Sequence, residues 1–246
     1  ITIIGAGIGG LTTAMLLKQK GFEPIVYERA PSIQPVGAGI IMANNAMQVY
    51  RKAGIQHKIE QAGNKITVMK ITDEWLKPLS VMELSKYESV YAVYNVAIHR
   101  AALQRILAEE TGFESIVLSK RLVRIEQNEN YQLSFEDGTV VYSDIVIGAD
   151  GIRSAVRNQL FNTGKIRDAR QLCWRGICEM SLGGKYQHEA NELWGRGKRF
   201  GFVKIGDSKV YWYAVANKGL VKERDQSLTQ LLNEFHPEVL DMINAT

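Results

Sequence analysis

The hydrophobic pattern of the first 28 residues predicts a strand, a helix and a second strand in close succession. Residues 1–4 form an apolar run rich in β-branched side chains, which is typical of a buried parallel strand. Residues 11–20 carry apolar side chains at helical spacing and end at Gly21, a residue that commonly terminates helices. Residues 23–28 predict a second strand that ends in the carboxylate of Glu28. This order predicts a unit built on a parallel sheet.

The alternation of strands and helices continues to about residue 160. The elements predicted for this part are helices at residues 44–53, 101–111 and 152–160, a strand at 116–118, and an apolar strand at 145–147 that delivers Asp150 and Gly151. Three short runs, at 122–126, 131–135 and 139–142, predict a three-stranded meander, with Asp137-Gly138 as its hairpin turn. We therefore expect an α/β, Rossmann-like domain with a parallel sheet and a meander.

A different pattern, with strands separated only by turns, occurs twice. Its predicted strands lie at residues 66–71, 79–82 and 90–96, and again at 173–180, 192–194, 200–205 and 210–215, followed by helical sequence at 226–243 that is interrupted at Pro237. We expect residues 65–96 to pair with the later strands in a second α+β domain built on a mostly antiparallel sheet. The predicted domains are discontinuous, with 1–64 and 97–163 in the first and 65–96 and 164–246 in the second.

The segment between the first strand and the first helix carries the chemistry of a dinucleotide site. Glycines occupy the first, third and sixth positions of the run from Gly5 to Gly10. In such a loop the first glycine permits a tight turn, the next lets backbone amides approach a pyrophosphate, and Gly10 lets helix and strand pack closely. The helix N-terminus adds a positive dipole, and Glu28 is placed to accept hydrogen bonds from a ribose. The alternative for Glu28 is a solvated charge at a strand end.

Composition and charge exclude several other classes of protein. The chain has 246 residues, is 46% hydrophobic and 23% charged, and contains 5 prolines, as expected for a globular protein. Its net charge of +4 is dispersed, which argues against a nucleic-acid partner. Two cysteines are too few for a disulfide framework, and the four histidines lack metal-ligand spacing, so no metal site is predicted. The apolar start lacks a basic leader and is interrupted by glycines and Lys18, so we expect no transmembrane segment and a cytoplasmic location.

Two motifs together carry a family resemblance. The first is the glycine loop that ends at Glu28, and the second is Gly148-Ala149-Asp150-Gly151-Ile152-Arg153-Ser154. With them the chain resembles the FAD-dependent aromatic hydroxylases, single-component flavoprotein monooxygenases similar to salicylate, urate and para-hydroxybenzoate hydroxylases and to zeaxanthin epoxidase. Further landmarks of that family are Tyr27-Glu28-Arg29-Ala30, Ile98-His99-Arg100, Trp174-Arg175-Gly176 and the strand Val210-Tyr211-Trp212. The resemblance covers nearly the whole chain.

The resemblance implies a set of cofactor contacts. Gly5, Gly7 and Gly10 would face the FAD pyrophosphate, Glu28 the adenosine ribose, and Arg100 the pyrophosphate and flavin side. Asp150 and Gly151 belong to a motif that similar enzymes use for FAD and NAD(P)H. A carboxylate at the carboxyl end of a parallel strand independently lies where open α/β sheets bind ligands. The remaining expected cofactor-binding residues are Arg29 and Gly39. For Asp150 the alternative is a helix cap, and for Arg100 a surface position.

The implied activity is an FAD-dependent monooxygenase that uses NADH or NADPH and O₂ to hydroxylate or epoxidise an aromatic or electron-rich small molecule through a flavin hydroperoxide. Aromatic residues of the strands at 200–205 and 210–215 are candidates for the wall of a substrate pocket. Arg175 is a candidate for orienting the substrate or flavin, with a surface salt bridge as its alternative. No catalytic side chain is assigned beyond this candidate.

Two other functions remain open at this point, and one expected motif is missing. The alternatives are an FAD-dependent reductase or dehydrogenase on the same scaffold and a non-catalytic nucleotide-binding fragment. Members of the family carry a third motif, a Gly-Asp pair that opens a helix near the flavin ribityl chain, which this sequence lacks. We therefore expect the sequence to be truncated before that motif, which bears on whether these residues alone hold FAD.

Overall fold

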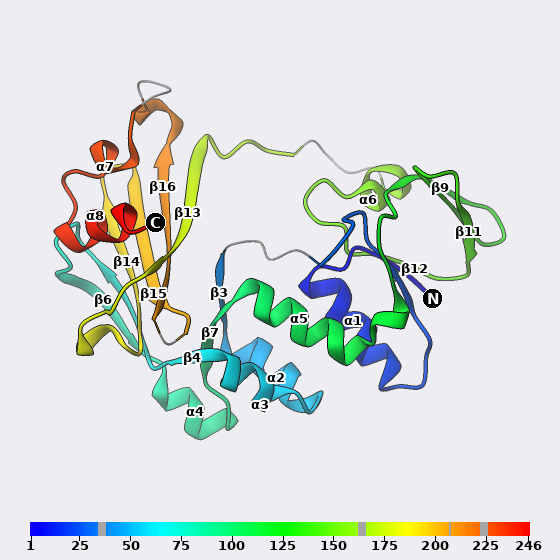
Figure 1. Ribbon diagram of the computed structural model, residues 1–246, viewed down its shortest axis with the longest axis horizontal. Coiled ribbons are helices and arrows are strands. Elements are labelled where there is room, and N and C mark those ends of the chain that lie inside the picture. Colours follow the sequence, from blue (N-terminus) through cyan, green and yellow to red (C-terminus); the bar gives the residue numbers. More distant parts are fainter. Residues whose placement is uncertain (34–37, 162–165, 207, 222–225) are drawn as a thin grey trace. The chain divides into compact units, whose positions relative to one another are not determined.

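The protein consists of two compact units, each made from two separate stretches of chain (Figure 1). The computed structural model describes residues 1–33, 38–161, 166–206, 208–221 and 226–246. The first unit combines Ile1–Pro35 with Ala101–Ile166, and the second combines Val36–Arg100 with Arg167–Thr246. The mixture of a parallel sheet with antiparallel sheets confirms the predicted fold class.

The first unit is built around a short parallel sheet. Its elements are β1 (Thr2–Ile4), α1 (Ile8–Lys18), β2 (Ile25–Tyr27), α5 (Arg100–Thr111, of which Arg100 falls in the second unit), a 3₁₀ turn at Phe113–Ser115, β8 (Ile116–Val117), β9 (Leu122–Gln127), β10 (Tyr131–Phe135), β11 (Val140–Ser143), β12 (Val146–Gly148) and α6 (Ala155–Leu160). The sheet order is β12-β1-β2-β8, and every neighbouring pair is parallel. All three residues of β1 are buried, as expected for a central parallel strand.

The predicted meander is confirmed as an antiparallel sheet of order β11-β10-β9. Gly138 adopts a φ of +84° in the turn between β10 and β11, a left-handed conformation that glycine adopts without steric cost. Leu133 and Phe135 of β10 are almost completely buried and pack in one cluster with Val156 of α6. This cluster also includes Ile4, so it joins the meander to the end of β1.

The second unit contains a six-stranded sheet and a three-stranded sheet. Its elements are β3 (Gly39–Met42), α2 (Asn44–Lys52), α3 (Gln56–Ala62), β4 (Gly63–Ile66), β5 (Val68–Thr72), β6 (Pro78–Glu83), α4 (Ser85–Tyr91), β7 (Asn95–His99), β13 (Gln171–Glu179), β14 (Glu189–Gly195), β15 (Lys198–Lys204), β16 (Lys209–Asn217), α7 (Leu228–Leu231) and α8 (Pro237–Asn244), with 3₁₀ turns at Gly184–Tyr186 and Lys218–Leu220. The large sheet has the order β13-β16-β15-β14-β5-β6 and the small sheet the order β3-β7-β4.

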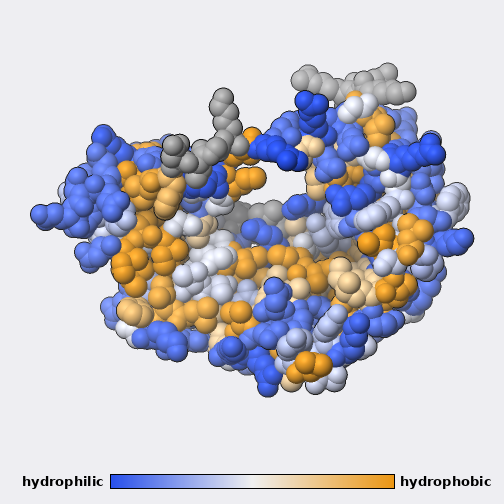
Figure 2. All heavy atoms as spheres, turned by 180° about the vertical axis from the view of Figure 1, so that it is seen from behind, coloured by the Kyte–Doolittle hydropathy of each residue, from blue (hydrophilic) through white to orange (hydrophobic). Residues whose placement is uncertain are grey.

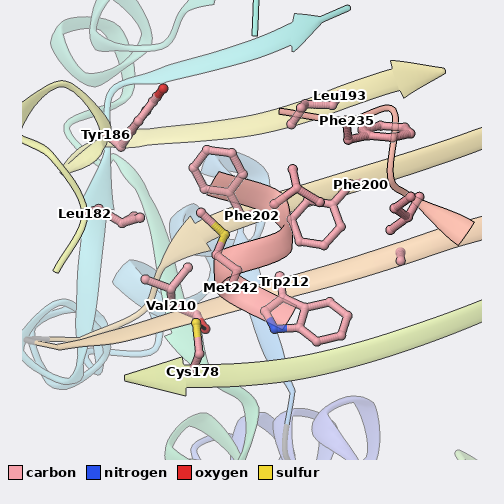
Figure 3. Packing of buried hydrophobic residues seen from close by; sticks show 13 residues of the cluster. Cys178, Leu182, Tyr186, Leu193, Phe200, Phe202, Val210, Trp212, Phe235 and Met242 are labelled. Atoms are coloured by element: carbon pink, nitrogen blue, oxygen red, sulfur yellow. Dashed lines mark hydrogen bonds between the residues drawn. The ribbon is translucent and has the colours of Figure 1, made fainter. Parts of the chain in front are cut away.

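The hairpin formed by β5 and β6 joins the later strands, as the sequence pattern predicts. β5 lies beside β14 in parallel, and all other neighbouring strands of the large sheet are antiparallel. The helix α8 packs on one face of this sheet (Figure 1). Figure 3 shows Met242 of this helix near the rings of Phe200 and Trp212, which stack with their centroids 5.5 Å apart. These side chains are almost completely buried, so this cluster forms the hydrophobic core between α8 and the sheet.

The boundary between the units differs from the prediction. The sequence pattern assigns residues 38–64 and 97–100 to the first domain, whereas both segments lie in the second unit. The reason is that β3 and β4 both pair with β7, so these segments form one sheet. The boundary predicted between residues 163 and 164 lies outside the described residues.

Several predicted elements also differ in type or in their ends. The strand predicted at 90–96 is wrong, because residues 85–91 form α4 and the strand begins at Asn95. No residue of α4 is buried, and its apolar side chains point to solvent, which explains why the sequence imitates a strand. The strand predicted at 66–71 is divided between β4 and β5. Pro237 begins α8 at a position where its missing amide has no intrahelical role.

The surface carries hydrophobic residues in several patches between hydrophilic ones, as Figure 2 shows for one face. None of the helices in the described part of the chain is long and apolar enough to cross a membrane.

Candidate functional site

Two glycines hold the end of β1, the start of α1 and the end of β12 in close contact. Gly5 has a φ of +106°, and a Cβ atom added there would lie 2.5 Å from the carbonyl oxygen of Ala149. A Cβ atom on Gly10 would lie 1.9 Å from the carbonyl oxygen of Gly5. No larger residue fits either position without moving the backbone. Gly5 and Gly10 therefore have the conformational and packing roles that the glycine pattern predicts.

Gly7 differs from these two glycines because it faces open space. An added Cβ atom would meet nothing within 4 Å at Gly7 or at Gly9. Gly7 is the N-cap of α1, no side chain caps this helix end, and the first turn holds no acidic residue. The amide of Leu11 donates to the Gly7 carbonyl at 3.0 Å, so the helical hydrogen bonds begin only there. The amides before Leu11 form an uncapped, positive helix end next to an open hollow, which suits an anion.

Glu28 lies directly beside this loop. One carboxylate oxygen accepts a hydrogen bond from the Ala6 amide at 2.7 Å, and the other accepts from the Ala30 amide at 2.9 Å. A carboxylate offers about four acceptor positions, so it retains capacity for ribose hydroxyls. The Ala6 carbonyl in turn accepts from Nε2 of Gln104 at 2.7 Å. The Ala6 peptide is thus held from both sides.

Gln104 is a site residue that sequence reasoning missed. It lies four residues after Arg100 on α5, and residues at this spacing share a helix face. Searching that face for polar residues would have found it.

Asp150 follows β12 and lies against the glycine turn, because a Cβ atom on Gly5 would lie 3.1 Å from its Cα atom. Its Oδ2 atom accepts from the amides of Ala155 and Val156, at 2.6 and 3.3 Å, at the start of α6. The helix-capping alternative therefore holds for this oxygen. Its Oδ1 atom is buried and has no hydrogen-bond partner among the described residues. A buried carboxylate oxygen without a donor is costly, so the site is suited to an added donor group.

The other predicted cofactor residues are more dispersed. Gly151 is exposed, with a φ of +83° and open space around it. Arg29 is exposed on the first unit. Arg100 begins α5, and its amide donates to the Ala38 carbonyl at 2.9 Å. Gly39 lies in the second unit, where an added Cβ atom would lie 2.5 Å from the Tyr211 side chain, so packing alone accounts for a glycine there. The first unit thus brings together the glycine loop, Glu28, Asp150 and Gly151.

A second candidate site is a pocket of about 640 Å³ on one face of the six-stranded sheet. Arg175 of β13 lines it, together with Tyr211 and Tyr213 of β16 and Val203 of β15. The neighbouring Cys173 side chain and the Tyr211 phenol raise the pKa of Arg175. Arg175, Tyr211 and Tyr213 are among the residues that the sequence proposes for this site. The side chains of Phe200 and Phe202 instead pack in the core on the opposite face of the sheet. All of them lie within the second unit.

A hydrogen-bond network occupies the centre of this pocket. Glu192 of β14 accepts from Nε1 of Trp194 at 2.7 Å, from Nη1 of Arg199 at 3.2 Å, and from the hydroxyl of Tyr213. Burial and the neighbouring Glu192 carboxylate raise the pKa of Tyr213 above its ordinary value. Glu192 is the second site residue that the sequence did not indicate, because its role depends on strand order.

Comparison with known proteins identifies the family. A family profile described as an FAD binding domain matches residues 1–181. The chain belongs to the FAD-dependent aromatic hydroxylase family. Within this family it is 34% identical to the aurachin C monooxygenase/isomerase of Stigmatella aurantiaca, a match that covers 100% of the chain and 65% of that protein. It is 30% identical to the 3-amino-4-hydroxybenzoate 2-monooxygenase of Streptomyces cremeus, a match that covers 100% of the chain and 64% of that protein.

Solved structures of this hydroxylase family share the fold. The crystal structure of Klebsiella pneumoniae HpxO complexed with FAD and uric acid matches with a TM-score of 0.87 and 27% identity. That match covers 100% of this chain and 64% of HpxO. The chain thus spans slightly less than two thirds of the length of these relatives.

The residues of the first unit fit the cofactor of this hydroxylase family. An open hollow at Gly7 lies beside a helix start that no side chain caps, and a fixed carboxylate follows β2. A buried oxygen of Asp150 has no donor among the described residues. Membership of the family and these three features together indicate FAD.

Proposed function

We propose that this protein is an FAD-dependent monooxygenase that uses NAD(P)H and O₂ to hydroxylate or epoxidise an aromatic or electron-rich small molecule. The observation that carries this proposal is the aromatic-lined pocket beside Arg175, in a chain whose other unit has the features of an FAD site. The names of its relatives support it, because both curated relatives described above are monooxygenases.

The first unit would hold the cofactor through its backbone. The uncapped amides at the start of α1 would bind the pyrophosphate, and the hollow at Gly7 would admit it. Glu28 would accept from the adenosine ribose. Oδ1 of Asp150 would accept a donor from FAD or from NAD(P)H. Arg29, Gly39, Arg100 and Gly151 remain proposed contacts that depend on the resemblance. When bound, FAD supplies the redox chemistry, which is acceptance of a hydride from NAD(P)H and activation of O₂.

The second unit would bind and orient the substrate. Arg175 would bind a polar group of the substrate, and the rings of Tyr211 and Tyr213 would contact its body and exclude water. Tyr213 keeps its proton because Glu192 accepts its hydrogen bond and burial opposes ionisation. It would therefore meet a substrate as a neutral phenol.

The decisive experiment is oxygen labelling. The full-length protein would be screened for compounds that stimulate NAD(P)H oxidation, and products of the best compound would be analysed after reaction under ¹⁸O₂. A monooxygenase inserts one labelled oxygen atom into each product molecule and consumes O₂. A product without the label would contradict the proposal and indicate a reductase or dehydrogenase. A protein that binds no FAD on titration would indicate a non-catalytic module.

A further inference from the structure

The pocket on the second unit is much larger than one aromatic ring requires. A cavity of about 150 Å³ holds a benzene molecule, whereas this pocket has about 640 Å³. It also reaches every strand of the large sheet. One lining residue from each strand, in sheet order, is Arg175, Tyr211, Val203, Glu192, Ile71 and Met82. Five steps between strands correspond to about 24 Å, so the pocket is elongated across the sheet.

One end of the pocket is cationic. Among the described residues no carboxylate lies within ion-pair distance of Arg175, whose neighbours in the pocket include the Cys173 thiol and the Tyr211 phenol. The acidic residue of the pocket, Glu192, already accepts three hydrogen bonds and pairs with Arg199. The positive charge of Arg175 is therefore left for a ligand. Its guanidinium is suited to a carboxylate, a phenolate or an enolate oxygen.

The opposite end is apolar and open. Met69 of β5 and Met82 of β6 lie directly across from each other, with 43% and 51% of their surfaces exposed. Ile71 shares their face, since it lies two residues from Met69 on the same strand. Adjacent exposed methionines on a pocket wall offer a deformable apolar surface that fits chains of varied shape.

We propose that the substrate of this pocket is an amphiphilic aromatic compound, with an anionic oxygen at Arg175 and an apolar chain of several carbons along Met69 and Met82. This inference rests on the proposed function, because it treats the pocket as the substrate site. It specifies a feature that the proposed function leaves open, since many aromatic substrates carry no apolar chain.

The test is a series of ligands that differ only in chain length. Binding of benzoate, 4-butylbenzoate and 4-heptylbenzoate to the FAD-loaded full-length protein is measured by calorimetry, without NAD(P)H. We expect the dissociation constant to fall by roughly two- to fourfold for each added methylene group. The neutral amide of 4-heptylbenzoate should bind at least about tenfold more weakly than the acid. Affinity that is independent of chain length, or equal for acid and amide, would overturn the proposal.

Two variants test where the charged end and the apolar chain of the ligand bind. Met82→Gln should reduce the affinity ratio between 4-heptylbenzoate and benzoate by roughly threefold or more. The matched control is Val81→Gln, because Val81 is 48% exposed on the same strand and pairs with Lys70 on the opposite face. Arg175→Gln should weaken all three acids by the same factor. The affinity ratio between 4-heptylbenzoate and benzoate within one variant does not depend on the fraction of folded protein. A folding defect therefore cannot produce the same result. An unchanged ratio in Met82→Gln would overturn the placement of the chain.

The outcome separates this inference from the proposed function. Chain-length-dependent binding without any ligand-stimulated NAD(P)H oxidation or oxygen insertion would support the pocket assignment and contradict the monooxygenase. Oxygen insertion only into compact aromatic compounds, with no effect of chain length on binding, would support the monooxygenase and contradict the amphiphilic substrate.

Discussion

The hydroxyl of Tyr213 on β16 donates to the carboxylate of Glu192 on β14, across the intervening strand β15. The two residues face each other through Gly201, with which both are in register. A Cβ atom on Gly201 would lie 2.3 Å from the Tyr213 ring, so only glycine lets the ring lie across β15. One glycine thus determines the hydrogen-bond network at the centre of the pocket.

Removing this hydroxyl should lower stability in a way that depends on pH. Tyr213→Phe should cost about 1.5–3 kcal/mol near pH 8, the range for a hydrogen bond to a charged group. The pKa of Tyr213 is raised above 10 in the folded state, so at high pH the tyrosine of the unfolded chain ionises first. The contribution of Tyr213 to the free energy of unfolding is therefore complete below pH 10 and is lost as the pH rises. The difference in free energy of unfolding between the variant and the parent, measured with urea, should therefore be smaller above pH 10 than at pH 8. Tyr142→Phe, at a residue that is 62% exposed, is the control. A difference that does not change with pH would contradict this account.

Two glycines of the same loop should respond differently to substitution by alanine. Gly10→Ala places a Cβ atom on the Gly5 carbonyl and should destabilise the fold by about 1–3 kcal/mol or more. Gly7→Ala meets no protein atom, so stability should change little while FAD affinity falls, because the methyl group fills the hollow proposed for the pyrophosphate. Thermal unfolding without FAD and an FAD titration measure the two effects. If Gly7→Ala leaves the FAD dissociation constant unchanged, the hollow is not the pyrophosphate site.

Glu28→Ala should weaken FAD binding. Loss of a charged acceptor for the ribose costs roughly 1.5–3 kcal/mol, or about one to two decades in the dissociation constant. The same variant frees the amides of Ala6 and Ala30, so its stability without FAD should be measured in parallel. Glu23→Ala, at an exposed acid just before the same strand, is the matched control. Equal affinities of Glu28→Ala and the control would show that Glu28 is only a strand-end charge.

Arg175→Ala should uncouple NAD(P)H oxidation from product formation. A substrate that is not held at Arg175 leaves the pocket open to water, which favours release of peroxide over oxygen transfer. We expect FAD to remain bound, NAD(P)H oxidation to continue or fall modestly, product per NAD(P)H to fall, and peroxide to rise. The ratio of product to NAD(P)H consumed, with peroxide assayed in parallel, measures this. Unchanged coupling and an unchanged KM would place Arg175 outside the substrate site.

Local chemistry explains which parts of the fold were predictable. The unit from β1 to β2 could be predicted because the glycine positions, the apolar strand and Glu28 are close in sequence. The start of α1 at Ile8 was missed, since Gly9 and Gly10 are poor helix formers whose presence in the first turn is a result of tertiary packing. The strand predicted in place of α4 failed because exposed tyrosine and valine side chains carry a strong strand preference.

Long-range pairing explains what could not be predicted. The placement of β3 and β4 in the second unit depends on β7, about 30 to 60 residues away in sequence. The contact between Glu192 and Tyr213 likewise requires the strand order and register of the large sheet. No local pattern contains this information. By contrast, the positions of Glu28 and Asp150 just after β2 and β12 were predictable, because each follows directly on a short apolar strand in the sequence.

The interleaving of the two units constrains the order in which a growing chain can fold. β1 pairs with β12, with Thr2 beside Val146, and β5 pairs with β14, with Val68 beside Glu189. During synthesis β1 and β5 emerge well before β12 and β14, so one hydrogen-bonding edge of each stays unpaired while more than a hundred further residues are made. Contacts of such long sequence separation form slowly, and open strand edges promote association between chains. Lower temperature, which weakens hydrophobic association between chains, should therefore increase the yield of native protein more than added FAD does, because the cofactor can stabilise the first unit only after β12 has joined it.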